Sequence, residues 1–305
     1  MTNIPPYLKP GDTIGLVCPA GYMDPEKVQT CINTLQAWGF RVKTGKTIGG
    51  NSTNYFSGND DERLEDLQLM LDDDEVRAVL CARGGYGIGR IVERIRFKKF
   101  RKDPKWIIGY SDVTVLLAHI YAQYRIAGLH SPMAAAFNDG GADSEYVLSL
   151  NHLLKGGTAL YNCIAHPFNN EGEAEGILVG GNLSLLVHLT GTSSDIKTKG
   201  KILFLEDVGE YLYNIDRMFW HLKRNGKLDK LAGLIIGGFT DIKDTDRPFG
   251  KPVYDIIREV VGEFDYPVCF KFPVSHEREN YALKTGVPHK LTVDRNGVQL
   301  KELSQ

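Results

Sequence analysis

The stretch Trp106-Ile-Ile-Gly-Tyr-Ser111-Asp-Val-Thr114 predicts a buried strand that turns sharply into a helix. Its apolar run lacks polar alternation, which is typical of a parallel strand covered on both faces. Ser111 falls at the turn, where a hydroxyl is exposed at the carboxyl end of a sheet and the next backbone N–H groups can stabilise an oxyanion. Gly109-x-Ser111 matches half of a nucleophile elbow, while Val113 stands in place of its second glycine. The alternative is that Ser111 only caps the helix.

Strand and helix signals alternate on both sides of this stretch. Apolar runs predict strands at 13–18, 41–44 and 76–82, and apolar residues at helical spacing predict helices between them. The first helix is bounded by Asp24-Pro25 and Gly39, and another is expected to run from the glycine-rich turn to about Ile95. This order of elements predicts an α/β fold with an open, mostly parallel sheet.

The second half of the chain loses this regular alternation. Residues 156–172 are rich in Gly, Asn and other polar residues without a clear period, so we expect them to link two domains. Strands and helices after the linker follow no βαβ rhythm, and Asn296-Gly297 predicts a hairpin. We therefore predict an N-terminal α/β domain at 1–155 and a smaller α+β, barrel-like domain at 173–305.

Composition excludes several classes of protein. The chain has 305 residues, with 36 Lys and Arg against 38 Asp and Glu. This balance argues for neither nucleic-acid nor membrane-surface binding. The first ten residues lack the features of a secretory signal, and no apolar run reaches the roughly 18 residues of a membrane span. We therefore predict a cytoplasmic protein.

The metal-binding and thiol residues also give negative predictions. The five cysteines are scattered, which favours reduced thiols over a disulfide framework or a catalytic cysteine. The eight histidines include no His-x-x-x-His pair, so no metal site is predicted.

Two further polar groups follow predicted strands. Glu206 opens the acidic cluster Glu206-Asp-Val-Gly-Glu210, and His276 lies in a polar loop. Taken alone, each fits an ordinary solvated loop, and the acids also suit the start of a helix. Together with Ser111 they occur in the order Ser, acid, His, which fits a histidine base oriented by a carboxylate. The nucleophile would then come from the first domain and the other two groups from the second.

The glycine-rich turn Arg83-Gly-Gly-Tyr-Gly-Ile-Gly89 allows two interpretations. A nucleotide- or sugar-phosphate-binding α/β protein would use it as a phosphate loop, but that fingerprint needs G-x-G-x-x-G after the first strand. The other interpretation is that Gly84 and Gly85 let the backbone approach a ligand. One of their N–H groups would then be an oxyanion donor.

Five stretches of the chain resemble the LD-carboxypeptidase family of serine peptidases, in the family's order. They are Ala82–Gly87, Ile108–Thr114, Gly176–Leu186, Phe204–Asp207 and Phe272–His276. The resemblance implies a cytoplasmic, often dimeric hydrolase that needs no cofactor, with Ser111 as nucleophile, Glu206 as acid and His276 as base. The oxyanion donors would be the backbone amides of Asp112 and of either Gly84 or Gly85.

The family contains two branches with different substrates. The muropeptide branch, which His130-Ser-Pro-Met133 resembles, releases the terminal D-Ala from a murein tetrapeptide during cell-wall recycling. The alternative is a microcin C self-immunity peptidase, which tends to be longer and to carry an extra loop around a nucleotide base. Ser275 stands where a glycine often precedes the catalytic histidine, and the loop after His276 also departs from the family pattern.

Arg83 is a candidate for binding the free carboxylate of such a substrate. A guanidinium matches a carboxylate in a bidentate way. The alternative is a structural ion pair between Arg83 and an acid of the protein.

Overall fold

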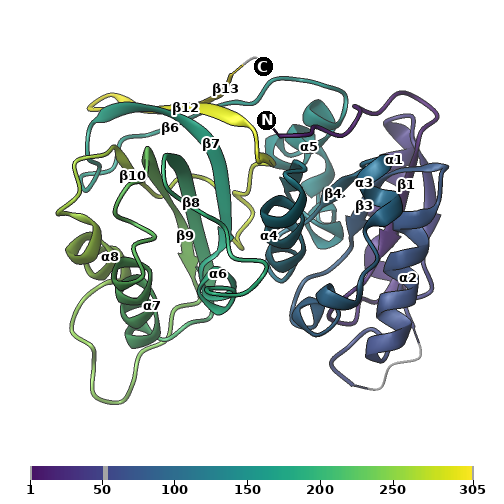
Figure 1. Ribbon diagram of the computed structural model, residues 1–305, viewed down its shortest axis with the longest axis horizontal. Coiled ribbons are helices and arrows are strands. Elements are labelled where there is room, and N and C mark those ends of the chain that lie inside the picture. The colour runs from purple at the N-terminus through teal and green to yellow at the C-terminus, as the bar shows by residue number, and fades with distance from the viewer. Residues whose placement is uncertain (1, 51–53, 304–305) are drawn as a thin grey trace. The chain divides into compact units, whose positions relative to one another are not determined.

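The computed structural model describes residues 2–50 and 54–303, which form two compact units (Figure 1). The first unit contains Met1–Gly157 and Tyr281–Lys284, and the second contains Thr158–Asn280 and Thr285–Gln305. Each unit is built on one sheet and carries its own buried apolar core.

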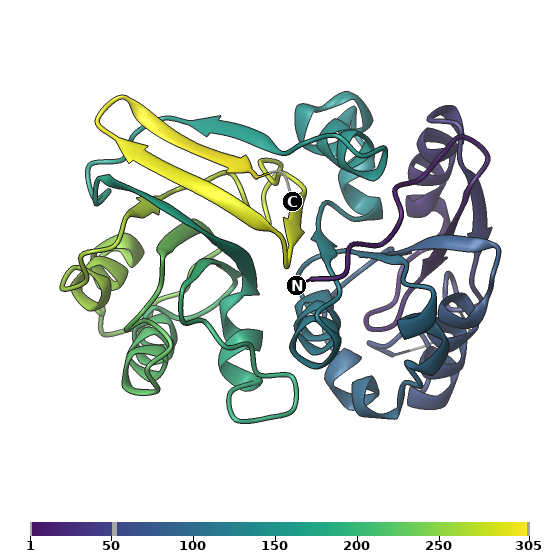
Figure 2. The same ribbon diagram turned by 45° about the horizontal axis from the view of Figure 1, so that its top comes forward.

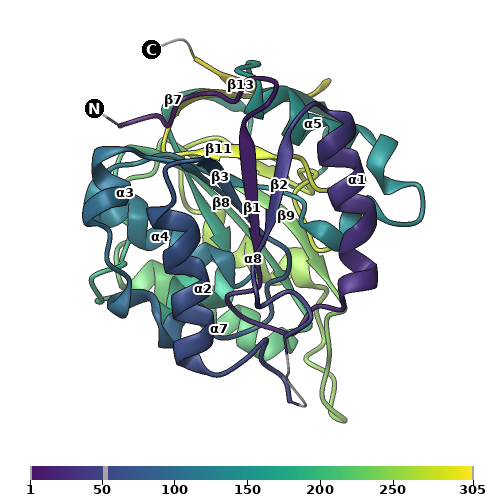
Figure 3. The same cartoon turned by 90° about the vertical axis from the view of Figure 1, so that its right-hand side faces the viewer.

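The first unit has a six-stranded sheet in the order β11-β5-β4-β3-β1-β2. The strands β1 to β5 pair in parallel, as expected for apolar runs joined by helices. Figure 3 shows α1 on one side of β1 and β2, with α2, α3 and α4 on the other, so helices cover both faces. The elements are β1 Thr13–Val17, α1 Gln29–Ala37, β2 Arg41–Thr44, α2 Asp60–Asp72, β3 Val76–Cys81, α3 Lys98–Lys102, β4 Trp106–Ile108, α4 Val113–Tyr124, β5 Gly128–His130, α5 Glu145–Leu154 and β11 Leu283–Thr285.

The second unit has a seven-stranded sheet in the order β10-β9-β8-β7-β12-β13-β6. Strands β7 to β10 pair in parallel, while β12 pairs antiparallel with β7 and, through the predicted hairpin, with β13 (Figure 2). The elements are β6 Leu160–Cys163, β7 Gly172–Asn182, α6 Leu183–His188, β8 Lys201–Val208, α7 Leu212–Arg224, β9 Gly233–Thr240, α8 Val253–Val261, β10 Val268–Phe270, β12 Pro288–Asp294 and β13 Gly297–Glu302.

This second sheet is curled rather than flat. The first half of β7 pairs with β12 and its second half with β8, so one strand serves an antiparallel and a parallel region. Asn170, just before β7, also forms an antiparallel bridge to Val268 of the edge strand β10. The predicted fold class, an open parallel sheet domain followed by a second domain of mixed strands, is confirmed.

Local structure differs from the sequence expectation in three places. The helix expected to reach Ile95 is wrong, because Ile88–Arg90 and Val92–Arg94 form two short 3-10 turns after a glycine with a φ of 147°. β6 lies inside the stretch 156–172 that was expected to be an irregular linker. β11, within the stretch expected to belong to the second domain, joins the sheet of the first unit.

Among the described residues, no helix is long and apolar enough to cross a membrane. The same residues contain no group of three or more His, Cys, Asp or Glu side chains that could hold a metal ion.

Candidate active site

Ser111 lies on a strained turn between β4 and α4. Its φ is 60° and that of Gly109 is 150°, both in the left-handed range that side chains usually avoid. A Cβ on Gly109 would lie 2.9 Å from a methyl group of Val113, so the glycine is needed where the chain doubles back. The N-cap of α4 is Asp112 rather than Ser111, so the interpretation of Ser111 as a helix cap is wrong. This geometry is that of a nucleophile elbow.

The glycine-rich turn passes directly beside this serine. A Cβ on Gly84 would lie 2.8 Å from the Cβ of Ser111, 3.0 Å from its Oγ and 3.2 Å from the backbone nitrogen of Asp112. The next residue, Gly85, has a φ of 98°, and the hydroxyl of Tyr55 lies 2.9 Å from its Cβ position. Both glycines are therefore required by close approach or by backbone conformation.

The carboxylate of Asp112 binds the far end of the same turn. It is buried and accepts hydrogen bonds from the backbone N–H groups of Ile88, at 2.8 Å, and Gly87. Burial raises the pKa of Asp112 to about 6, although these bonds and the charge of Arg63 oppose the shift. Because Asp112 occupies these two N–H groups and no α-helix begins here, the geometry does not favour a phosphate loop.

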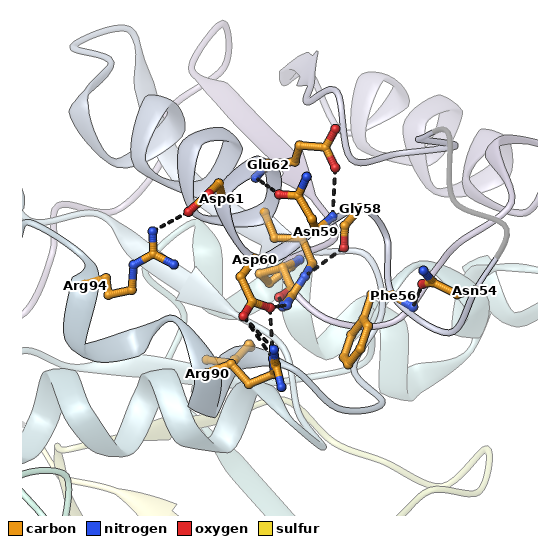
Figure 4. A network of polar contacts seen from close by, with 12 residues as sticks. Asn54, Phe56, Gly58, Asn59, Asp60, Asp61, Glu62, Arg90 and Arg94 are labelled. Atoms are coloured by element: carbon orange, nitrogen blue, oxygen red, sulfur yellow. Dashed lines mark hydrogen bonds and ion pairs between the residues drawn. The ribbon is translucent and has the colours of Figure 1, made fainter.

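A buried arginine supports this turn from the α2 side. The guanidinium of Arg63 is fully buried, donates to the carbonyl of Pro19 at 2.7 Å and lies 2.5 Å from the Cβ position of Gly87. It also bonds to Asp60, whose carboxylate receives a bidentate pair of hydrogen bonds from Arg90 at 2.9 and 2.8 Å (Figure 4). The buried charge is thus paired and hydrogen-bonded.

In the second unit, fully buried Glu206 pairs with partly buried His276. The Nδ1 atom of His276 lies 2.6 Å from Oε2 of Glu206, which is fully buried in β8. The β8–β9 register shifts between Leu205 and Asp207, and such irregularities often re-aim a side chain beside a functional site. Burial lowers the pKa of His276, but the hydrogen bond and charge of Glu206 outweigh it, so the pKa lies above its ordinary value.

Two glycines in β9 allow the His276 loop to lie against the sheet. A Cβ on Gly237 would lie 2.3 Å from the carbonyl oxygen of Val274, and one on Gly238 would lie 2.4 Å from the Cβ of Ser275. The Ser275 hydroxyl accepts from the N–H of Glu277 and donates to the carbonyl of Glu279, each at 3.0 Å. Ser275 therefore orders the loop where many family members are expected to have glycine.

Asp207 points to a different partner from its neighbour Glu206. Its carboxylate accepts from the side chain of Asn182 at 2.8 Å and from the N–H of Ser184 at 2.9 Å, which fixes the start of α6. Burial, together with the charge of Glu206, raises the pKa of Asp207 to about 6. Glu206 and Asp207 lie inside β8 rather than in a loop. Because successive side chains of a strand point to opposite faces, the two carboxylates contact different partners.

Arg83 is exposed, and its Nη1 atom donates to the carbonyl of Tyr22 at 2.6 Å. This bond holds the side chain beside the glycine turn through a carbonyl oxygen rather than an acid.

The structure gathers the predicted residues into two groups. Ser111, Asp112, Gly84, Gly85 and Arg83 lie in the first unit, and Glu206 and His276 lie in the second. Sequence reasoning missed Asp207 and the glycine pair of β9. Adjacent glycines inside a predicted strand were the available signal, because such glycines mark a close backbone approach.

A serine on a strand–helix turn and a histidine paired with a buried glutamate are the parts from which serine hydrolases are built. Residues 14–131 match the model of the LD-carboxypeptidase N-terminal domain, and residues 175–291 match that of the LD-carboxypeptidase C-terminal domain. The chain therefore belongs to the LD-carboxypeptidase family. The predicted membership of this family and the predicted serine-type carboxypeptidase activity are confirmed.

Individual relatives support the same assignment. The chain is 39% identical over 287 residues to a probable murein peptide carboxypeptidase of Bacillus subtilis, covering 92% of this chain and 89% of that protein. It is 26% identical over 325 residues to the Escherichia coli microcin C7 self-immunity protein MccF, covering 96% and 94%. The crystal structure of muramoyltetrapeptide carboxypeptidase from Oxalobacter formigenes has a TM-score of 0.85 at 26% identity, covering 96% of this chain and 99% of that one.

Proposed function

We propose that this protein removes the terminal D-Ala from murein tetrapeptide in cell-wall recycling. The observation that carries the proposal is the 2.6 Å contact between the Nδ1 atom of His276 and buried Glu206, because it is the pairing that a general base for a serine nucleophile requires. The names of the Bacillus subtilis and Oxalobacter formigenes proteins support a muropeptide as substrate. Cytoplasmic location and a homodimer stay predictions.

In the proposed mechanism, Ser111 attacks the carbonyl carbon of the bond before D-Ala while Nε2 of His276 takes the hydroxyl proton. Glu206 holds the Nδ1–H of His276 and stabilises the imidazolium. The amides of Asp112 and of the Gly84–Gly85 pair donate to the oxyanion. His276 then protonates the departing amine, the acyl-enzyme forms, and water hydrolyses it with His276 again acting as base.

A microcin C-type conjugate is the second candidate substrate. It is favoured by the match to the self-immunity protein MccF over nearly the whole chain. The identity to that protein is lower than the identity to the murein peptide carboxypeptidase, so we place the muropeptide first.

The test is release of free D-Ala from murein tetrapeptide by the purified protein, with a microcin C-type conjugate and an L-Ala-terminated tetrapeptide as parallel substrates. Ser111→Ala should lower turnover on the order of 10³-fold or more, because the nucleophile is lost. Thermal unfolding checks that the variant is folded. Near-full activity of folded Ser111→Ala would contradict the mechanism, and cleavage of the conjugate alone would reverse the order of the two substrates.

A further inference from the structure

The carboxylate of Asp112 does not do what an aspartate at the start of a helix usually does. An N-cap aspartate normally accepts a hydrogen bond from an N–H of its own helix. Asp112 is the N-cap of α4, yet its side chain makes no capping bond. It is instead 1% exposed and accepts from the N–H groups of Ile88 and Gly87 in the glycine turn. The side chain thus joins the turn to the serine elbow.

The glycine turn depends on such outside contacts for its conformation. Gly85 and Gly87 both have positive φ values, and glycine loses more conformational freedom on folding than any other residue. One end of the turn is held by the bond from the N–H of Gly21 to the carbonyl of Gly84, at 3.0 Å. The other end is held by Asp112. Without the Asp112 carboxylate, the part of the turn that follows Gly84 and Gly85 would therefore lose its hydrogen-bond acceptor.

Neighbouring groups stabilise the ionised form of the Asp112 side chain, although it is buried. Arg63 packs against Gly87 on the other side of the turn, and its charge favours the ionised form of Asp112. Arg63 is itself held by Pro19 and Asp60. The turn is thus clamped between a buried anion on the elbow and a buried cation on α2.

We propose that the Asp112 side chain is a positioning residue that aligns the two halves of the oxyanion hole. Its backbone N–H belongs to one half, and its carboxylate fixes the turn that supplies the other half from Gly84 or Gly85. Asp112 would then set the distance between the two backbone N–H donors of the oxyanion hole. The inference rests on the proposed function, since it assumes that Ser111 is the nucleophile and that an oxyanion forms beside it.

The experiment compares Asp112→Asn with Asp66→Asn. Asp66 is the matched control, because it is also a buried carboxylate of the first unit and accepts from the backbone N–H groups of Lys46 and Thr47, at 3.0 and 2.9 Å. Each variant is measured for kcat and KM of D-Ala release, for the rate of labelling by a serine-reactive phosphonate, and for Tm. The phosphonate reports on the oxyanion hole because its adduct places a tetrahedral oxygen there.

We expect Asp112→Asn to lower kcat and the labelling rate on the order of 10- to 100-fold, with KM changed less than about twofold. The amide keeps the size of the side chain but replaces one acceptor oxygen with an NH₂ group that cannot accept. Asp66→Asn should lower Tm while leaving kcat and labelling within about twofold of wild type. If Asp112→Asn does not fold, Asp112→Glu keeps the charge but displaces it, and the same change in kcat is expected.

A fall in Tm with unchanged kcat and labelling in both the Asp112 and Asp66 variants would overturn the inference, because Asp112 would then be only structural. Failure of the proposed substrate gives a different result. Wild-type protein that is labelled at Ser111 but releases no D-Ala would refute the murein tetrapeptide while the labelling rates still test Asp112. Wild-type protein that is neither labelled nor active would overturn both proposals.

Discussion

The turn that carries Ser111 and the loop that carries His276 are held in place by different means. Ser111 is placed by backbone conformation, with positive φ values at the serine and at Gly109 and with Gly84 packed against it. His276 is placed by a side-chain pair with fully buried Glu206. Both regions also pack closely against glycines, so the His276 side chain depends on its direct pair with a buried charge in addition to a close fit of the backbone.

Among the variants that test this comparison, the largest effect is expected from Glu206→Gln. The amide can hold the ring of His276 but cannot stabilise the imidazolium, and loss of the corresponding acid in serine proteases costs about 10⁴-fold in kcat. We expect a fall on the order of 10³- to 10⁴-fold in D-Ala release. Glu173→Gln, an exposed carboxylate of the same unit that pairs with Lys290, is the control and should retain activity. A loss of less than tenfold in Glu206→Gln would show that His276 does not rely on this charge.

The same variant has a pH signature. A general base must be neutral, so activity rises as the pH passes upward through the pKa of His276. That pKa is raised in the folded protein, so the acid limb of kcat/KM should lie above the ordinary histidine value of about 6.5. In Glu206→Gln burial remains while the negative charge is gone, so the limb should move to lower pH. An unmoved limb would mean that another group titrates in this range.

A smaller effect is expected from Gly84→Ala. The new methyl would meet the Cβ and Oγ of Ser111 and the backbone of Asp112 within 3.2 Å, so the serine or the turn must shift. We expect kcat to fall on the order of 10²- to 10³-fold, the range for a lost oxyanion donor. Gly89→Ala is the matched control in the same turn, because nothing lies within 4 Å of its Cβ position. Equal effects of the two variants would contradict the proposed placement.

The smallest effect is expected from Arg83→Lys, which tests substrate binding rather than the placement of Ser111 or of His276. If Arg83 pairs with the terminal carboxylate, replacing its planar fork with an ammonium should raise KM about three- to tenfold and leave kcat nearly unchanged. Steady-state kinetics with murein tetrapeptide measures this. An unchanged KM would assign Arg83 to holding the Tyr22 carbonyl alone.

The parts of the site that depend on neighbouring residues could be predicted from the sequence. The strand β4, its glycine and Ser111 lie within six residues, so periodicity and turn chemistry indicated the elbow. Glu206 and His276 lie 70 residues apart in the sequence. Its members could be proposed only from their order along the chain and from family resemblance, since no local pattern encodes the register shift in β8 that accompanies Glu206.

Other features could not be predicted because they depend on tertiary contacts. The sequence shows Asp112 at a helix start, where a capping role is the normal expectation, and nothing local indicates that its carboxylate turns to Ile88. Strand β11 has three residues and lies at a sheet edge, so it is too short to show a periodic pattern in the sequence. Its pairing with β5 depends on residues about 150 positions earlier.

That short strand also fixes an order of events during synthesis. The return segment Tyr281–Lys284 is anchored in the first unit by bonds from Ala282 to the Ser149 hydroxyl at 2.9 Å and from Lys284 to the Gly157 carbonyl at 2.9 Å. A ribosome makes the other strands of that unit first, then most of the second unit, and only afterwards the strand that completes the first sheet. The unit that begins to form first is therefore finished only after His276 has been added to the chain.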